Sequence, residues 1–165
     1  MTQFFDLLKC PKCNDSLVLN QKSLLCGNLH NFDITKEGYV NLILANQKSS
    51  LISGDNKQIV QARNDFLEKG NYKFLFDSIV ENKLLEKDDF RNILEVGCGS
   101  GYYLEMFRKL FKPELSFGTD ISKEAIKFCS KKYSQSHFAV MNSYNLCFKE
   151  NEFNLIISIF SPFDI

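Results

Sequence analysis

The sequence lacks tryptophan and any excess of charge of one sign, because its 20 lysines and arginines match its 20 aspartates and glutamates. The overall charge therefore does not indicate a nucleic-acid-binding protein, and any such contact would need a local basic patch. No hydrophobic run reaches the length that crosses a membrane, and residues 1–6 show no signal-peptide pattern. We therefore expect a cytoplasmic protein that makes no contact with a membrane.

The residues that are present are enough for a real apolar core. Of the 165 residues 44% are hydrophobic and 16 are phenylalanine, which suffices for one modest domain and a smaller one. The six cysteines fall into two groups, three within the first thirty residues and three spaced singly further along. This distribution argues against a secreted disulfide framework.

The most informative stretch is an apolar run followed by three glycines at alternate positions. Residues 92–96 predict a buried strand, Gly97, Gly99 and Gly101 predict a tight turn, and the residues from Tyr102 onward repeat at helical spacing. Such a turn lets a ligand approach bare backbone beside the free N–H groups of a helix start. The spacing is not that of a dinucleotide-binding turn, since Tyr102 follows the last glycine directly, and this disfavours a nicotinamide dehydrogenase.

Three further strands are predicted after this turn, at residues 115–120, 137–140 and 153–159. The last is a continuous apolar run, as expected for a strand buried on both faces. Asp120 ends the first of them, 19 residues beyond Gly101, where an acidic side chain can accept the hydroxyl groups of a ribose. A helix cap or a turn is the plainer role for Asp120.

The pattern Glu95-x-Gly97-x-Gly99-x-Gly101 resembles the first motif of class I S-adenosylmethionine (AdoMet) methyltransferases. The resemblance implies an α/β fold with a Rossmann-like sheet, of which this chain holds the first four strands. It also implies that the cofactor is bound by Tyr72, Glu95, Gly97, Gly99, Gly101, Tyr103, Leu104, Asp120, Asn142 and Ser143.

Simpler roles stay open for several members of this set. The glycines alone are compatible with a turn that binds nothing. Tyr72 is also explained as a packing residue at a helix start, and Asn142 and Ser143 as turn residues after the third strand. Arg63 is a candidate for either an RNA phosphate contact or a surface ion pair.

The N-terminal segment has the ligand spacing of a zinc site. Cys10 and Cys13 form a C-x2-C pair, and Cys26 and His30 form a C-x3-H pair. Three thiolates and one imidazole suit tetrahedral zinc, and a full set of protein ligands indicates a structural metal. Short strands at residues 17–19 and 24–25 complete a ribbon hairpin that would depend on the metal to fold. The alternative is a chance cluster of reduced thiols near a solvent-exposed histidine.

This ribbon runs into F-D-x-x-K-E-G-Y-V-N-L at residues 32–42, and the combination resembles the RlmA family of large-subunit ribosomal RNA (guanine-N1) methyltransferases. Pieces of residues 54–72 resemble the same family, which places the tyrosine corresponding to Tyr72 against the cofactor. The resemblance implies AdoMet-dependent methylation of N1 of a guanine in 23S rRNA. One departure is Phe160-Ser161-Pro162, where the family has alanine before the proline.

We predict three regions: a zinc ribbon at residues 1–45, a linker with helices at 46–91, and the N-terminal part of a methyltransferase domain at 92–165. The helices are expected at residues 55–70 and 73–85. The family continues beyond the fourth strand, so the chain resembles a truncated member. We expect that strand to form an exposed apolar edge and the chain alone to be inactive.

Two functions follow as hypotheses, an rRNA methyltransferase and a non-catalytic, zinc-stabilised RNA-binding or interaction module. No residue stands out as a general base, so no catalytic residue is assigned. Ribosomal RNA is the expected partner, with a homodimer as one candidate assembly. The ribbon offers Lys9, Lys12, Lys22 and Lys36 to RNA, but nearby acidic residues nearly balance them.

Overall fold

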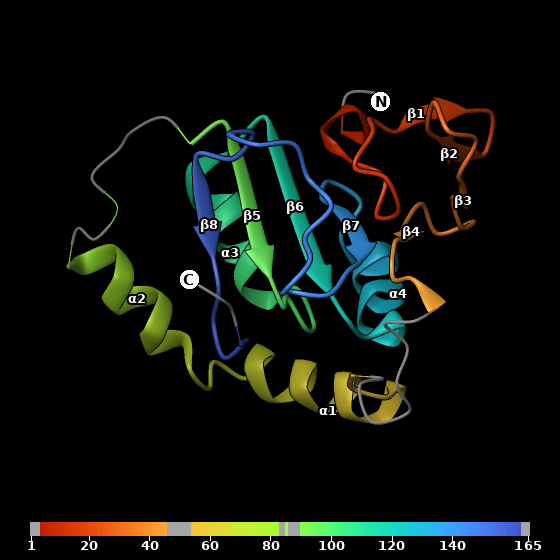
Figure 1. Cartoon of the computed structure of the whole chain (residues 1–165). Coiled ribbons are helices and arrows are strands. Elements are labelled where there is room, and N and C mark those ends of the chain that lie inside the picture. Colours follow the sequence, from red (N-terminus) through yellow and green to blue (C-terminus); the bar gives the residue numbers. More distant parts are fainter. Residues whose placement is uncertain (1–3, 46–53, 83–84, 86–89, 163–165) are drawn as a thin grey trace.

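The computed structural model describes residues 4–45, 54–82, 85 and 90–162. The chain forms a small antiparallel sheet and a larger parallel sheet (Figure 1). The elements in chain order are η1 (Phe5–Leu7), β1 (Val18–Asn20), β2 (Ser23–Leu25), β3 (Asn31–Asp33), β4 (Val40–Asn41), α1 (Lys57–Glu68), α2 (Lys73–Glu81), β5 (Asn92–Val96), α3 (Tyr102–Phe111), β6 (Leu115–Asp120), α4 (Lys123–Lys132), β7 (His137–Val140) and β8 (Leu155–Ile157). No helix in these ranges is both long enough and apolar enough to cross a membrane.

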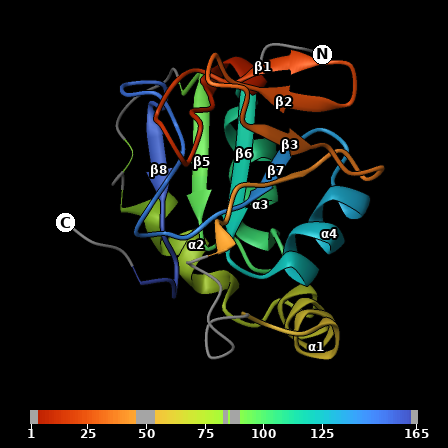
Figure 2. The ribbon, with the colours of Figure 1, turned by 45° about the vertical axis from the view of Figure 1, so that its right-hand side comes forward.

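The larger sheet has the strand order β4-β7-β6-β5-β8, and every neighbouring pair is parallel. This confirms the predicted α/β fold. Helix α3 connects β5 to β6, and α4 connects β6 to β7, so each of these parallel pairs is joined by a crossover helix. The carboxyl ends of the strands therefore meet at one edge of the sheet. Helix α1 lies at that edge, whereas β1 and β2 lie near the opposite one (Figures 1 and 2).

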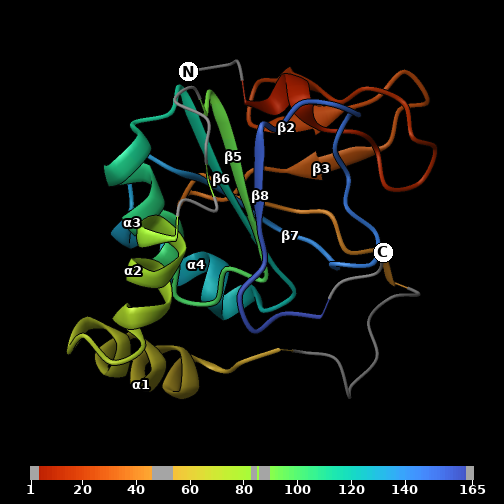
Figure 3. The ribbon, with the colours of Figure 1, turned by 90° about the vertical axis from the view of Figure 1, so that its left-hand side faces the viewer.

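The two faces of the sheet pack against different partners. Along β5, Leu94 and Val96 belong to an apolar cluster shared with the N-terminal ribbon, while Ile93 belongs to a second cluster shared with the helices. This alternation follows from the two-residue period of a strand. Figure 3 shows the result edge-on, with α3 and α4 on one side of the sheet and the ribbon on the other. The ribbon thus provides a layer of the main core.

Strand β4 was not predicted as a strand. In the sequence, residues 32–42 stand out only through their resemblance to the RlmA family. Residues of this segment are buried in both apolar clusters, and β4 also pairs with β7, matching Val40 to Ala139 and Asn41 to Val140. The predicted four-stranded sheet therefore has five strands, and its outermost strand on that side comes from the region assigned to the ribbon.

Several predicted boundaries shift by a few residues. Helix α1 begins at Lys57 because the side chain of Asn56 accepts the N–H of Ile59 at 3.0 Å and caps it. Helix α2 ends at Glu81 rather than at residue 85. Strand β8 covers three residues of the predicted 153–159. The polar linker at residues 49–53 lies outside the described residues.

Helix α1 is held in place by α4. The ammonium group of Lys132 donates to Asn64 Oδ1 and to Glu68 Oε1, each at 2.6 Å. Ser122, which caps α4, also donates to the carbonyl oxygen of Asp55 just before α1. These contacts fix the α1 side chains beside the carboxyl ends of β5 and β6.

Candidate cofactor site and metal centre

The three glycines after β5 all adopt positive φ, but their surroundings differ. A Cβ on Gly97 would overlap the Ser161 side chain, and one on Gly101 would come within 2.8 Å of the Tyr133 ring. A Cβ on Gly99 would meet nothing closer than Arg63 Nη1 at 3.7 Å. Packing therefore requires glycine at 97 and 101, whereas a Cβ on Gly99 would make only ordinary van der Waals contact with Arg63.

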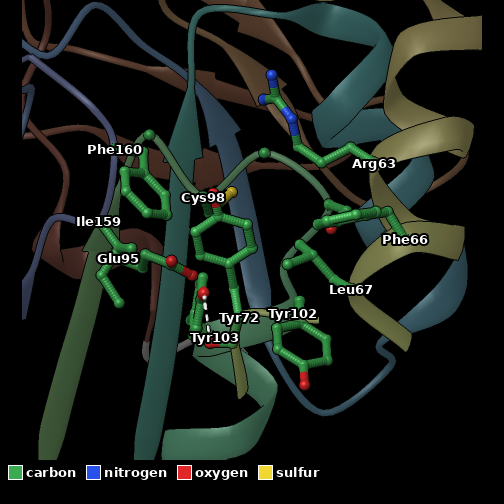
Figure 4. Close-up of a pocket in the computed structure, with 13 residues that line it drawn as sticks. Arg63, Phe66, Leu67, Tyr72, Glu95, Cys98, Tyr102, Tyr103, Ile159 and Phe160 are labelled. Carbon is green, nitrogen blue, oxygen red and sulfur yellow. Dashed lines mark hydrogen bonds between the residues drawn. The ribbon is translucent and has the colours of Figure 1, made fainter. Parts of the chain in front are cut away.

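A cavity of about 330 Å3 lies over this turn, and Figure 4 shows the side chains around it. Its lining combines the turn with the predicted residues Tyr72, Glu95 and Tyr103. Arg63 and Phe66 reach it from α1, and Ile159 and Phe160 reach it from the segment after β8. The fold thus brings five of the ten predicted cofactor residues together at this cavity: Tyr72, Glu95, Gly97, Gly99 and Tyr103.

Glu95 is buried beside this cavity. Its Oε2 accepts the N–H of Leu104 in the first turn of α3 at 2.9 Å. Burial raises the pKa of this carboxyl to about 8, and the nearby charge of Asp120 adds to the effect. The backbone N–H of Leu104 therefore holds Glu95 in place, while its side chain packs in the helix-side core and does not line the cavity.

Tyr72 and Tyr103 connect α2 and α3 at the cavity. The hydroxyl of Tyr103 donates to the backbone carbonyl of Tyr72 at 3.2 Å, drawn as the dashed line in Figure 4. Tyr72 has a φ of 62°, a left-handed conformation that is uncommon for a residue with a side chain. Its ring borders the cavity instead of packing in the core.

A second cavity of about 380 Å3 lies beyond β6 and is lined by Asp120, Asn142 and Ser143. Asp120 accepts the N–H of Gly99 through Oδ2 and that of Ser122 through Oδ1, both at 2.8 Å. Burial raises its pKa above the ordinary value. Asp120 therefore does fill the turn role considered from sequence, and it also borders a cavity. Asn142 likewise fills a turn role, because its Oδ1 accepts the N–H of Tyr144.

Arg63 lines both cavities, as do Gly97 and Phe160. Its guanidinium pairs with Asp55 at 2.6 Å, which is the ion pair considered from sequence. The resemblance to methyltransferases already placed the segment Phe160-Ser161-Pro162 beside the transferred methyl group, whereas the positions of Arg63 and Phe66 at the site were not predicted. The only sequence signal for them was their place in segments that resemble the RlmA family, and spacing alone does not show where α1 docks.

The four predicted zinc ligands converge in the ribbon. The ligand atoms of Cys10, Cys13, Cys26 and His30 all lie within 4.8 Å of one another. His30 directs Nδ1 toward the sulfurs of Cys10 and Cys26, at 3.4 Å from each. Hydrogen bonding from Asn28 lowers the pKa of the Cys13 thiol to about 6, which favours the thiolate that binds metal. Three sulfurs and one nitrogen fit a structural zinc ion.

Two protein families match consecutive stretches of this chain. Residues 8–51 match the family described as "RlmA, N-terminal", and residues 93–165 match the one described as "Methyltransferase domain". The chain thus joins a Cys3His ribbon similar to the RlmA N-terminal domain to a segment similar to a methyltransferase domain. These matches support AdoMet and one structural zinc ion as its cofactors, and both the cavity lined by Gly99 and the Cys3His cluster fit them.

Two curated relatives extend this RlmA-type similarity over nearly the whole chain. A Bacillus subtilis protein named as a putative 23S rRNA (guanine-N1)-methyltransferase, YxjB, is 31% identical over 96% of this chain and 57% of its own length. The 23S rRNA (guanine(748)-N1)-methyltransferase of Streptomyces fradiae is 24% identical over 94% of this chain and 55% of its own length. The chain thus spans just over half the length of the relatives it matches.

Proposed function

We propose that this RlmA-type chain serves AdoMet-dependent methylation of N1 of a guanine in 23S rRNA. The observation that carries the proposal is the pair of cavities at the carboxyl ends of β5, β6 and β7, which share Arg63, Gly97 and Phe160. In parallel α/β sheets, ligands bind at this edge. The names of the two relatives supply the substrate class.

The two cavities suit the two halves of AdoMet. The cavity over Gly99 would take the methionine part, because the glycine turn and the N-terminus of α3 offer bare backbone there. The cavity beside Asp120 would take the adenosine part, with the carboxylate accepting from the ribose and Asn142 or Ser143 near the adenine. Tyr72, Glu95 and Tyr103 would then surround the methionine end, with Leu104 contributing only its backbone.

AdoMet supplies an electrophilic methyl group when it is bound. N1 of guanine lies on the base-pairing edge, so the target must be unpaired or turned out of a helix before it can be methylated. The protein's own contribution is to hold N1 in line with that methyl group, and positioning of this kind can account for much of a rate enhancement. We assign no general base to the described residues.

The proposed substrate also bears on the compartment and the assembly in which the protein acts. A ribosomal RNA substrate implies a cytoplasmic protein, and a homodimer is one assembly to test by measuring its mass in solution. The competing function is a zinc-stabilised RNA-binding module without catalysis.

Calorimetry of the 165-residue chain with AdoMet tests the cofactor assignment. We expect one site per chain and no heat with NAD, since Tyr102 occupies the position of the third glycine of a dinucleotide-binding turn. Absence of AdoMet binding in a folded, zinc-loaded chain would refute the enzyme proposal and leave the binding module.

A further inference from the structure

Four exposed aromatic side chains gather at the mouth of the cavity over the glycine turn. Tyr72 is at the centre, with the rings of Phe66, Phe74 and Phe160 at centroid distances of 5.8, 5.6 and 5.6 Å. Phe160 is 77% exposed and Phe74 is 62% exposed. We call these four residues the aromatic cluster. Exposed aromatic groups of this size commonly mark a binding surface.

The rings of the aromatic cluster leave faces open for a flat ligand. Tyr72 and Phe160 meet edge to face at an interplanar angle of 89°, and Phe160 still keeps most of its ring surface open to solvent. Tyr72 and Phe160 also have left-handed backbones, with φ of 62° and 58°. Such conformations are unfavourable and tend to persist where a site needs them.

The position of the aromatic cluster beside the glycine turn indicates which kind of ligand it binds. Phe66, Tyr72 and Phe160 line the same cavity as Gly97 and Gly99, whereas Phe74 extends the surface outward. A flat group resting on Phe160 would therefore face the part of the site proposed for the methyl donor. Unpaired RNA bases are recognised by stacking on aromatic side chains, and their base-pairing edges then stay free.

We infer that the aromatic cluster is the stacking surface for the unpaired target guanine, with Phe160 under that base and Phe74 under a neighbouring one. The inference rests on the proposed function, because the methyl acceptor is taken from it. It assigns the acceptor side of the site to residues of α1, α2 and the segment after β8. The zinc ribbon is excluded from this role, since β1 and β2 lie near the opposite edge of the sheet (Figure 1).

The test is RNA binding by the 165-residue chain, measured by fluorescence anisotropy with and without AdoMet. Two labelled single-stranded oligonucleotides are compared, one with a single guanine and one abasic at that position. We expect the chain to prefer the guanine RNA. Phe160→Ala should weaken that binding by about 5- to 150-fold, the effect of losing one base–aromatic stack. Phe160→Tyr should retain it, and Phe74→Ala should weaken binding to both RNAs.

Leu110→Ala is the matched control, because Leu110 is a 44% exposed apolar residue of α3 outside the aromatic cluster. It should bind both RNAs like the parent chain. Thermal unfolding of each variant shows whether it is folded. If Phe160→Ala does not fold, RNA binding by Phe160→Tyr and Phe74→Ala still tests whether the aromatic cluster binds RNA.

The inference is overturned if the parent chain shows no preference for guanine, or if Phe160→Ala and Phe74→Ala both bind RNA like the parent. It is also overturned if these variants change only self-association of the chain. AdoMet binding is scored separately by calorimetry. If the chain binds AdoMet but the Phe160 variants bind RNA like the parent, the proposed cofactor function stands and the stacking surface is rejected. If the chain does not bind AdoMet but Phe160→Ala weakens RNA binding, the RNA-binding surface stands and the cofactor function is rejected.

Discussion

Gly99 is the residue of the glycine turn that a substitution can test as part of the cofactor site. Gly99→Val would place a side chain in the space between the turn and Arg63, where AdoMet is proposed to lie. We expect loss of AdoMet binding by calorimetry. Gly38→Val is the matched control, because Gly38 also has positive φ but a Cβ there would meet no atom within 4 Å. If both variants bind AdoMet like the parent chain, the cofactor lies elsewhere.

Asp120 is the residue proposed to hold the ribose. Asp120→Ala removes the acceptor, and losing one such buried hydrogen-bonding partner costs about 1–3 kcal/mol, or roughly 5- to 150-fold in affinity. The substitution also frees the N–H groups of Gly99 and Ser122, so unfolding by urea must be measured alongside. Asp120→Asn keeps one carbonyl acceptor and should bind AdoMet more tightly than Asp120→Ala. Equal affinity for all three chains would remove Asp120 from the site.

Glu95 gives the stability of the chain a specific pH dependence. Its pKa rises from an ordinary 4.5 to about 8 on burial, so the folded chain keeps a proton that the unfolded chain releases between these values. Stability from this group is therefore lost as pH rises through that window. Glu95→Gln stays neutral and can still accept the N–H of Leu104. In urea unfolding, its advantage over the parent should grow from pH 4.5 to 8 and then level off.

Glu105→Gln should show the opposite trend. Its hydrogen bond from Arg108 lowers the pKa of Glu105, so the parent loses that stabilisation as pH falls. If Glu95→Gln and the parent have parallel stability curves, Glu95 is ionised in the fold and the proposed protonation is wrong.

At the scale of elements, the ribbon and the large sheet depend on each other. Cys10 and Cys26, two of the zinc ligands, belong to the same apolar cluster as Leu94 and Phe117 of the large sheet. Cys13→Ser should lose the zinc, and the unfolding temperature of the whole chain should drop along with the ribbon. Cys147→Ser, which removes a thiol outside the metal cluster, should keep one zinc per chain by elemental analysis. A metal-free chain with an unchanged unfolding temperature would show that the ribbon is a separate unit.

The elements that the sequence predicted well are those with a strong local pattern. Strand β5 is largely apolar and is followed directly by the glycine turn, and the zinc ligands have C-x2-C and C-x3-H spacing, which is typical of zinc sites. Strand β4 has only two residues, and its register is set by β7 far along the chain, so no local pattern indicates it. The docking of α1 through Lys132 is likewise a contact between distant residues, which is why Arg63 and Phe66 were not placed at the site.

At the scale of the whole molecule, β8 is the outermost strand of the large sheet on the side away from β4. Ile156 in this strand is 61% exposed, so the edge presents apolar surface. The relatives are nearly twice as long as this chain. We therefore expect the 165-residue chain to bind AdoMet without methylating 23S rRNA. Labelled AdoMet and unmodified rRNA test this, and stoichiometric N1-methylguanine would contradict it.

The pairing of β4 with β7 also has a consequence for the order of events during synthesis. The ribbon leaves the ribosome first and holds all four of its zinc ligands, so it can take up metal early. Val40 and Asn41, however, have no sheet to join until Ala139 and Val140 have been made. During synthesis, the apolar face of the ribbon that later packs on the large sheet therefore stays uncovered until β7 has been made. In that interval this face can bind chaperones or lead to aggregation.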